Sequence, residues 1–203
     1  NFGQKTLTIL MALKKSLTIE QICAHLQLKA NGQKNLKQNK TNKKFVYLIS
    51  PNKITDINFY NDLALVLSSK KISFFQLRLK KETNSNKLII GKKIKKICNK
   101  YKVKFLINDD PLLARKLKAD GCHLGQKDMD LIKARKILKN KIIGVTCHNS
   151  INLAKSAIEA GADYLAFGAF YASNTKIVKY RASLTVLKSI KKITSIPIVA
   201  IGG

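Results

Sequence analysis

From residue 45 onward, short and continuously apolar segments alternate with longer amphipathic ones. The segments between them repeat apolar residues at helical spacing, as Ile90, Ile94 and Ile97 do. Apolar strands separated by helices predict an α/β fold built on a parallel sheet. The apolar segments expected to be strands are Phe45–Ile49, Ile72–Leu77, Phe105–Ile107, Gly121–Leu124, Ile142–Val145, Tyr164–Phe167 and Ile198–Ile201.

A short repeated motif in the sequence favours a barrel over an open sheet. The letters KADG at 118–121 and GADY at 161–164 lead into their strands in the same manner. Repeating units of this kind favour a (β/α)8 TIM barrel, and no glycine-rich nucleotide loop follows the first strand. Only seven strand signals precede the last residue, Gly203. We therefore expect a barrel that lacks its eighth βα unit, is incomplete at its C-terminal end and leaves the edges of its first and seventh strands open.

The first 44 residues differ in pattern from the rest. Residues 1–28 show a broken helical periodicity, with Thr18 and Gln21 spaced as a capping box, and predict an N-terminal helical extension. No recognition helix follows, so an appended helix is favoured over a helix-turn-helix. Residues 29–44 are rich in Lys and Asn and cannot bury enough apolar surface to fold, so they are interpreted as a linker. Residues 45–203 form the predicted barrel domain.

The net charge of +28 raises the question of a polyanionic partner. Of 39 basic residues only four are arginine, and lysine lacks the planar fork that reads bases. We expect no specific nucleic acid partner, only weak, salt-sensitive association.

No apolar run is long enough to cross a bilayer and no signal peptide is seen, which indicates no membrane partner and a cytoplasmic location. The four scattered cysteines are expected to be reduced.

Two successive predicted strands end in acidic residues. Asn108-Asp109-Asp110 follows one strand, and Gln126-Lys127-Asp128 follows the next. The carboxyl ends of parallel strands share one rim, so Asp109 and Asp128 could meet at a hard cation such as Mg²⁺. The alternative is structural: Asp110 before Pro111 would be a helix N-cap, and Asp128 would cap the following helix.

Other polar residues follow the remaining strands. Gln76, Arg78 and Lys80 alternate, so they point to one side and would bring two cations opposite the acidic pair, as a pyrophosphate requires; a solvated strand end is the alternative. Thr146 would contact substrate or begin a turn. The hydroxyls and lysine of the loop after Gly168 could cradle a phosphate, and Gly202-Gly203 could approach an anion through backbone N–H groups. His123 is expected to be a packed histidine, and Cys147-His148 not to be a catalytic pair.

Six motifs follow one another along the chain: QLRLK (76–80), IND (107–109), ADGCHLGQKD (119–128), IIGVTCHN (142–149), GADYLAFGAFYASNTK (161–176) and IPIVAIGG (196–203). In their order and spacing they closely resemble thiamine phosphate synthase, a (β/α)8 enzyme, over residues 45–203. The resemblance implies a transferase that joins 4-amino-2-methyl-5-(diphosphooxymethyl)pyrimidine to a thiazole phosphate, giving thiamine phosphate and pyrophosphate with the help of Mg²⁺. Both substrates would be small molecules, and a homo-oligomeric state is left open.

The resemblance also implies a role for each matching residue. Asp109 and Asp128 would hold Mg²⁺. The residues implied to bind the pyrimidine diphosphate are Gln76, Arg78, Lys80, Asn108, Thr146 and Lys176, of which Arg78, Lys80, Thr146 and Lys176 would be catalytic. Those implied to bind the thiazole phosphate are Ser173, Asn174, Thr175 and the glycines Gly202 and Gly203.

The chain departs from the family pattern at three positions. Leu79 stands where the family usually has Glu, Thr146 where it has Ser, and Ser173 where it has Thr. The last two keep a hydroxyl group. Two alternatives remain: a thiazole tautomerase-like relative, which would need no pyrophosphate site, and an inactive, basic barrel that serves as a binding module.

Overall fold

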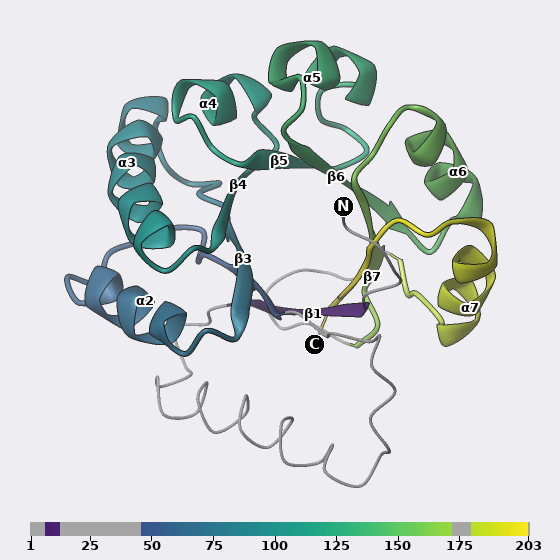
Figure 1. Ribbon diagram of the computed structural model, residues 1–203, viewed down its shortest axis with the longest axis horizontal. Coiled ribbons are helices and arrows are strands. Elements are labelled where there is room, and N and C mark those ends of the chain that lie inside the picture. Colours follow the sequence, from purple (N-terminus) through teal and green to yellow (C-terminus); the bar gives the residue numbers. More distant parts are fainter. Residues whose placement is uncertain (1–6, 13–45, 172–179, 203) are drawn as a thin grey trace, which may run out of the picture.

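One curled parallel sheet organises the protein, with helices on its outside (Figure 1). The structure is a computed structural model that describes residues 7–12, 46–171 and 180–202. The strands are β1 (Leu7–Ala12), β2 (Val46–Ile49), β3 (Ile72–Leu77), β4 (Lys104–Asn108), β5 (Gly121–Leu124), β6 (Ile142–His148), β7 (Tyr164–Gly168) and β8 (Ile198–Ile201). The helices are α2 (Phe59–Ser68), α3 (Asn84–Lys100), α4 (Pro111–Lys116), α5 (Leu131–Leu138), α6 (Ile151–Glu159) and α7 (Leu184–Ile193).

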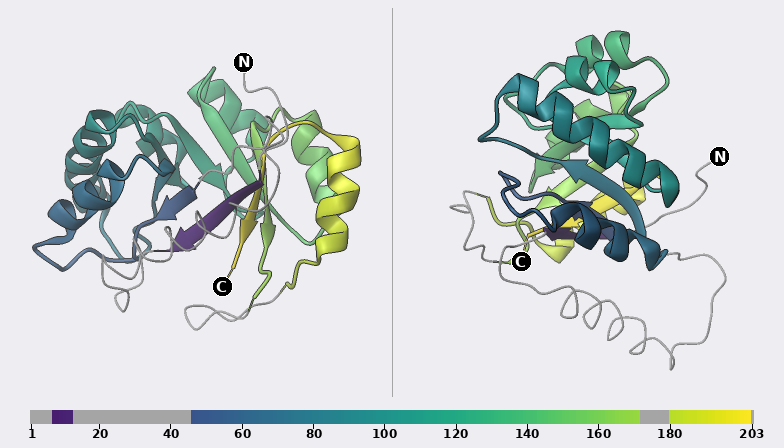
Figure 2. Two further views of the ribbon diagram at one scale, coloured as in Figure 1. Left: turned by 60° about the horizontal axis from the view of Figure 1, so that its bottom comes forward. Right: turned by 90° about the vertical axis from the view of Figure 1, so that its left-hand side faces the viewer.

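All seven predicted strands are present, as β2 to β8, and each pairs in parallel with the next. The α/β class and the parallel sheet are therefore confirmed. The helices follow the strands in alternation and surround the sheet from α2 round to α7 (Figure 2). Among the described helices, none combines the length and apolarity that crossing a bilayer requires.

The predicted helix is wrong for residues 7–12, which form strand β1. Ile9 of β1 lies opposite Val46 of β2 on one side and Ala200 of β8 on the other. The two sheet edges that we expected to be open are thus paired, and the strand order closes on itself. A short apolar run cannot be assigned to helix or strand by periodicity alone. Here the segment forms a strand because the edges of β2 and β8 would otherwise leave their backbone N–H and C=O groups unpaired.

The full set of eight βα units is not seen in the described residues, which contain eight strands but only the six helices α2 to α7. The rest of the predicted helical extension, residues 1–6 and 13–28, lies outside the described residues. So does the predicted linker at 29–44. The domain boundaries drawn from the sequence therefore stay a prediction.

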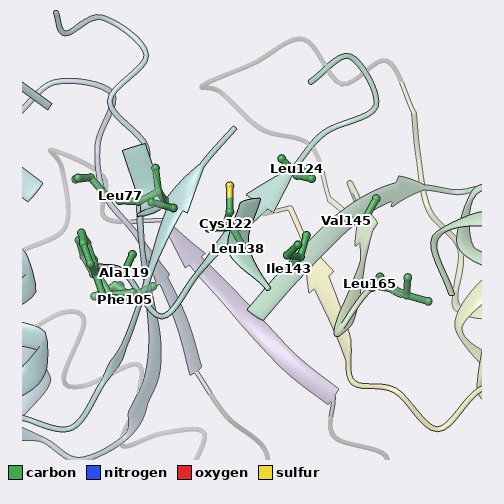
Figure 3. Packing of buried hydrophobic residues seen from close by; sticks show 14 of the residues in the cluster. Leu77, Phe105, Ala119, Cys122, Leu124, Leu138, Ile143, Val145 and Leu165 are labelled. Atoms are coloured by element: carbon green, nitrogen blue, oxygen red, sulfur yellow. The ribbon is translucent and has the colours of Figure 1, made fainter. Parts of the chain in front are cut away.

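The alternation of side chains along each strand separates two apolar cores. Leu77, Phe105 and Leu165 point outward and belong to the larger core, which includes residues of the helices (Figure 3). Tyr47 and Leu106 point the other way and form a smaller interior cluster with residues of β7 and β8. Polar residues at the same alternate positions near the strand ends are therefore directed into the mouth of the barrel.

The repeated motifs KADG and GADY form the same structure at two places: an aspartate just before a strand accepts a hydrogen bond from the backbone of the preceding strand. Asp120 accepts a hydrogen bond from the backbone N–H of Phe105 at 3.0 Å, and Asp163 accepts one from Ile143 at 2.7 Å. Each carboxylate also pairs with a cation, Lys104 for Asp120 and Arg135 for Asp163. Because both aspartates precede their strands, they stabilise the end of the barrel opposite to the polar strand ends.

Helix caps decide between two interpretations of the acidic residues. Asp110 caps α4 by accepting the N–H of Leu113 at 2.9 Å, with Pro111 at the first helical position, as predicted. The cap of α5 is Asp130 rather than Asp128. The structural alternative for Asp128 is therefore wrong, and its carboxylate is available at the rim.

Candidate active site

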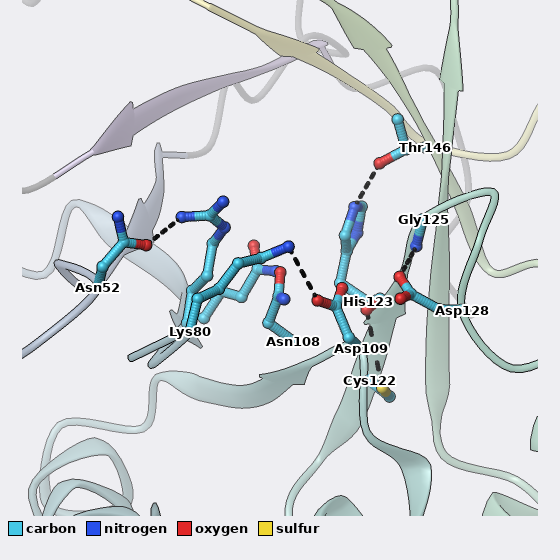
Figure 4. A network of polar contacts seen from close by, with 11 residues as sticks. Asn52, Lys80, Asn108, Asp109, Cys122, His123, Gly125, Asp128 and Thr146 are labelled. Atoms are coloured by element: carbon cyan, nitrogen blue, oxygen red, sulfur yellow. Dashed lines mark hydrogen bonds and ion pairs between the residues drawn. The ribbon is translucent and has the colours of Figure 1, made fainter. Parts of the chain in front are cut away.

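Polar side chains from β3, β4, β5 and the loops after them converge at the carboxyl end of the sheet (Figure 4). Gln76 and Asn108 form the floor of this cluster. Gln76 is buried, and its side-chain amide donates to the Asn108 side-chain oxygen at 2.6 Å. Both residues were predicted site residues. The register of β3 and β4 pairs Gln76 with Leu106, and Asn108 follows two positions later on the same face of β4.

Arg78 is held in place by two residues that the sequence analysis did not select. Its backbone N–H donates to the Ser50 hydroxyl at 2.8 Å, and its guanidinium donates to the Asn52 side-chain oxygen at 2.5 Å. Partial burial lowers the pKa of the guanidinium, and the Asp109 carboxylate opposes that effect. Arginine stays charged in such surroundings, so Arg78 presents a fixed cation to the rim.

Lys80 and Asp109 form an ion pair with 3.2 Å between the ammonium nitrogen and a carboxylate oxygen. Asp109 has a φ of 64°, a left-handed conformation that aspartate tolerates better than most residues. Its backbone N–H donates to the carbonyl oxygen of His123 at 2.8 Å, which ties the end of β4 to β5. The turn therefore directs the Asp109 carboxylate toward the side chains that follow β3.

Asp128 faces Asp109 (Figure 4) and accepts the backbone N–H of Gly125 at 2.7 Å. Its pKa is raised above the usual value, first by partial burial and then by the neighbouring Asp109 carboxylate. Two carboxylates that repel each other are relieved by a divalent cation, and oxygen donors suit Mg²⁺. No group of three or more acidic, His or Cys ligands occurs in the described residues, so this pair would leave most of the coordination shell to water and phosphate oxygens.

A small cavity of about 90 Å³ adjoins the ion pair of Lys80 and Asp109. Lys87, in the first turn of α3, lines it together with Lys80 and Asp109. The cavity therefore brings a second lysine near the rim, and the sequence analysis did not select Lys87. Nothing in its sequence context distinguishes it from the other lysines of the chain.

Thr146 comes from β6, and its hydroxyl lies 2.8 Å from Nε2 of His123 (Figure 4). His123 is a buried, packed histidine, as predicted.

Cys147, which follows Thr146, is buried, and burial raises the pKa of its thiol to about 12. His148 stacks on Tyr180 with ring centroids 4.4 Å apart. Cys147 and His148 therefore do not form a nucleophile and base, in agreement with the sequence analysis.

Gly202 follows β8 at the same end of the sheet. Its φ of 104° is strained for any other residue, and a Cβ atom there would lie 2.6 Å from the Cβ of Ala169. The position thus requires glycine. The other residues predicted for the phosphate loop lie outside the described residues: Ser173, Asn174, Thr175, Lys176 and Gly203.

The family model described as Thiamine monophosphate synthase (TMP-TENI) matches residues 46–203. That span includes β2 to β8 and all the site residues above. The chain belongs to the thiamine monophosphate synthase family. As a member of this family it is a transferase of thiamine biosynthesis, which confirms the resemblance described from the motifs.

Individual members of the family match most of the chain. The thiamine-phosphate synthase of Pelagibacter ubique (strain HTCC1062) is 91% identical over 168 residues, 83% of this chain and 81% of the relative. That of Nitrosomonas eutropha (strain DSM 101675 / C91 / Nm57) is 40% identical over 159 residues, 78% and 74% of the two chains. A solved structure, thiamine phosphate pyrophosphorylase from Pyrococcus furiosus, has a TM-score of 0.68 at 28% identity and covers 78% of this chain and 75% of its own.

Proposed function

We propose that the chain joins an aminopyrimidine methyl diphosphate to a thiazole phosphate and releases pyrophosphate. The observation that carries this assignment is the juxtaposition of opposite charges at one rim: Arg78 and Lys80 beside the facing carboxylates of Asp109 and Asp128. A diphosphate and a divalent cation together satisfy both sets of charges. A site that bound an uncharged or purely cationic ligand would not need this combination.

The carboxylate pair fits Mg²⁺, which would bind to Asp109 and Asp128 and neutralise charge on the departing diphosphate. Arg78 and Lys80 would contact the phosphate oxygens, and Lys176 would join them as the resemblance implies. Arg78 suits this role because Ser50 and Asn52 already hold it in place before substrate arrives. Charge stabilisation of this preorganised kind is typically the largest contribution to catalysis.

In the proposed reaction the bond between the pyrimidine methylene carbon and the diphosphate oxygen breaks first. Electrons from the aminopyrimidine stabilise the resulting carbocation, and pyrophosphate keeps the bonding pair. The thiazole nitrogen then donates its lone pair to the same carbon to form the new C–N bond. Gln76 and Asn108 would orient the pyrimidine, and the protein gains rate by holding the two rings in proximity.

The thiazole phosphate would bind to the loop after β7 and to the turn after β8. The residues assigned there by resemblance are Ser173, Asn174, Thr175, Gly202 and Gly203. Support from the structure concerns Gly202, whose backbone conformation and close approach to Ala169 exclude a side chain. Backbone N–H groups at such a turn can approach a phosphate closely.

The same proposal covers three finer points. The complete fold would be the eight-unit (β/α)8 barrel of this enzyme class, with β1 as one of its strands. The chain would work in the cytoplasm, which is supported by three free and buried thiols at Cys98, Cys122 and Cys147. Its partners would be the two small molecules, without specific nucleic acid and without a membrane, and a homo-oligomer stays an open option.

The experiment is an assay of pyrophosphate release from the two substrates, with and without Mg²⁺. We expect release that depends on Mg²⁺ and is abolished by Asp109→Asn or by Lys176→Ala. Full activity in either variant would refute the role assigned to that residue. A thiazole tautomerase or an inactive binding barrel would release no pyrophosphate under any of these conditions.

A further inference from the structure

A line of buried hydrogen bonds connects the interior of the barrel to Thr146. The Tyr47 hydroxyl lies 2.8 Å from the Tyr164 hydroxyl, which lies 2.7 Å from Nδ1 of His123. The other ring nitrogen of His123 lies 2.8 Å from the hydroxyl of Thr146. These four side chains come from β2, β7, β5 and β6, so the line crosses the barrel interior.

The two tyrosines and the histidine are fully enclosed by the barrel. They are 2%, 4% and 7% exposed, for Tyr47, Tyr164 and His123 in that order. Burial raises the pKa of both tyrosines, so both hydroxyl groups are neutral near pH 7. A Cβ atom on Gly144 would overlap the Tyr164 ring, with 1.8 Å to its nearest atom. Glycine at this position makes the space that the line needs.

The buried end of the line determines the direction of every hydrogen bond. Within the described residues, the Tyr47 hydroxyl has one hydrogen-bond partner, the Tyr164 oxygen. A buried donor without an acceptor is costly, so Tyr47 donates to Tyr164. Tyr164 then donates to Nδ1 of His123, and the neutral imidazole carries its proton on Nε2 and donates it to Thr146.

We propose that Tyr47, Tyr164 and His123 are positioning residues that make the Thr146 hydroxyl an obligate hydrogen-bond donor toward the substrate. Because the Thr146 oxygen already accepts from His123, its own hydrogen is directed to the site. The ligand group it meets must be an acceptor, such as an oxygen of the diphosphate. The opposite direction would leave the buried Tyr47 hydrogen unpaired and would present Thr146 only as an acceptor, which an anion would repel. This proposal rests on the proposed function for its substrate but not for the direction of the line.

The direction can be measured without any substrate. Long-range ¹⁵N–¹H correlation spectra of the full chain distinguish Nε2–H from Nδ1–H histidine, and His123→Gln identifies the signals of this residue. We expect the Nε2–H tautomer for His123. A mainly Nδ1–H ring would overturn the proposal, whether or not the chain is active.

The effect on the reaction is tested by a double-mutant cycle. Tyr164→Phe removes one hydroxyl group and keeps the ring, so the Thr146 hydroxyl is no longer held as a donor toward the diphosphate. We expect pyrophosphate release to slow about tenfold at saturating substrate, the effect typical of losing one hydrogen bond to a charged group. In a Thr146→Val background, the same change should have no further effect because the hydroxyl on which it acts is already absent. Equal slowing in both backgrounds would show that Tyr164 acts through packing, and would overturn the proposal.

Two further variants serve as controls. Tyr47→Phe changes the far end of the line and should slow release less than Tyr164→Phe does, again only when Thr146 is present. Tyr60→Phe, the same chemical change on α2 outside the barrel interior, should leave the rate unchanged. If the unaltered chain released no pyrophosphate at all, the proposed function would fail, while the tautomer spectrum would still decide the direction of the line.

Discussion

Asp128 is the residue whose charged form is most clearly disfavoured by its surroundings in the folded chain. Its pKa is raised by partial burial and by Asp109. An acid with a raised pKa in the folded state binds its proton more tightly when folded, so it contributes stability below its ordinary pKa of about 3.9 and loses that contribution as pH rises through the raised value. The arrangement is unfavourable at neutral pH unless a cation is bound.

Asp128→Asn should therefore stabilise the chain in the absence of Mg²⁺. We expect its melting temperature to match that of the unaltered chain near pH 3.5, and to exceed it increasingly as pH rises through the raised pKa of Asp128. Calorimetry in a chelating buffer measures this. Added Mg²⁺ should reverse the order, because only the unaltered chain gains from binding it. A variant less stable than the unaltered chain at pH 7 without metal would contradict the prediction.

The sequence predicted individual site residues where a polar residue lies at the end of a strand or directly after it. Gln76, Asn108 and Asp109 were found in this way and do lie together. Ser50 and Asn52 carry the same signal after the first predicted strand and were overlooked. The contacts of Tyr47 and Tyr164 could not be predicted, because residues 117 positions apart meet only when strand registers around a closed barrel are known.

At the level of elements, the repeated aspartate before β5 and β7 is a stabilising device. Asp163 accepts hydrogen bonds from the Ile143 backbone and from Arg135, each at 2.7 Å. Arg135 also donates to the carbonyl oxygens of Lys139, Lys141 and Gly161. One carboxylate therefore helps to tie α5 and the loop after it to the starts of β6 and β7.

Asp163→Ala should destabilise the chain by about 1–3 kcal/mol, since a backbone donor and a guanidinium both lose their acceptor. The shift in the midpoint of urea unfolding measures this loss. Asp163→Asn keeps an acceptor for Ile143 and should lose less. Because Asp163 lies at the end opposite to the active site, we expect pyrophosphate release per folded molecule to stay unchanged. A large loss of activity without loss of stability would contradict the structural role.

Strand β1 is the element that the sequence analysis assigned wrongly, whereas the other seven strands were found close to their actual bounds. The segment LTILMA fits both a helix and a strand, and the choice depends on two partners located far away in the chain. The feature that should have indicated a strand was the pair of open sheet edges, because exposed edges are rarely left unpaired in a parallel barrel. Sequence reasoning noticed the edges but assigned no strand to fill them.

Ile9→Pro tests whether β1 closes the sheet. Ile9 pairs with both β2 and β8, and proline removes a backbone donor from the ladder between them. We expect the melting temperature to fall by about 2–8 °C, the shift expected for a loss of about 1–2 kcal/mol in a chain of this size. Ile9→Val, which keeps the backbone donor, should lower the melting temperature less than Ile9→Pro does. Identical melting of the proline variant would show that β1 contributes nothing.

At the scale of the whole molecule, 39 basic residues stand against 11 acidic ones, which leaves a net charge of +28. Three ion pairs are found among the described residues. Repulsion among the remaining lysines opposes folding, and salt screens it over a distance of about 10 Å at 0.1 M ionic strength. The basic composition therefore affects stability more directly than it indicates a partner.

We expect the melting temperature to rise as NaCl is added from about 0.01 M to about 0.1 M, because the screening length falls from about 30 Å to about 10 Å. A thermal melt followed by circular dichroism measures this. NaCl is preferred to sulfate or phosphate, which could bind to the site or be excluded from the surface. A melting temperature that falls with salt would indicate that attractive pairs dominate over repulsion.

The assignment of the rim to a diphosphate and its metal is tested most directly by calorimetric titration with inorganic pyrophosphate, because this measures binding without turnover. We expect affinity at least about tenfold higher with Mg²⁺ than in a chelating buffer. Asp109→Asn should remove that difference, because one of the two facing carboxylates is lost. Equal affinity with and without Mg²⁺, or an undiminished metal effect in Asp109→Asn, would contradict the assignment.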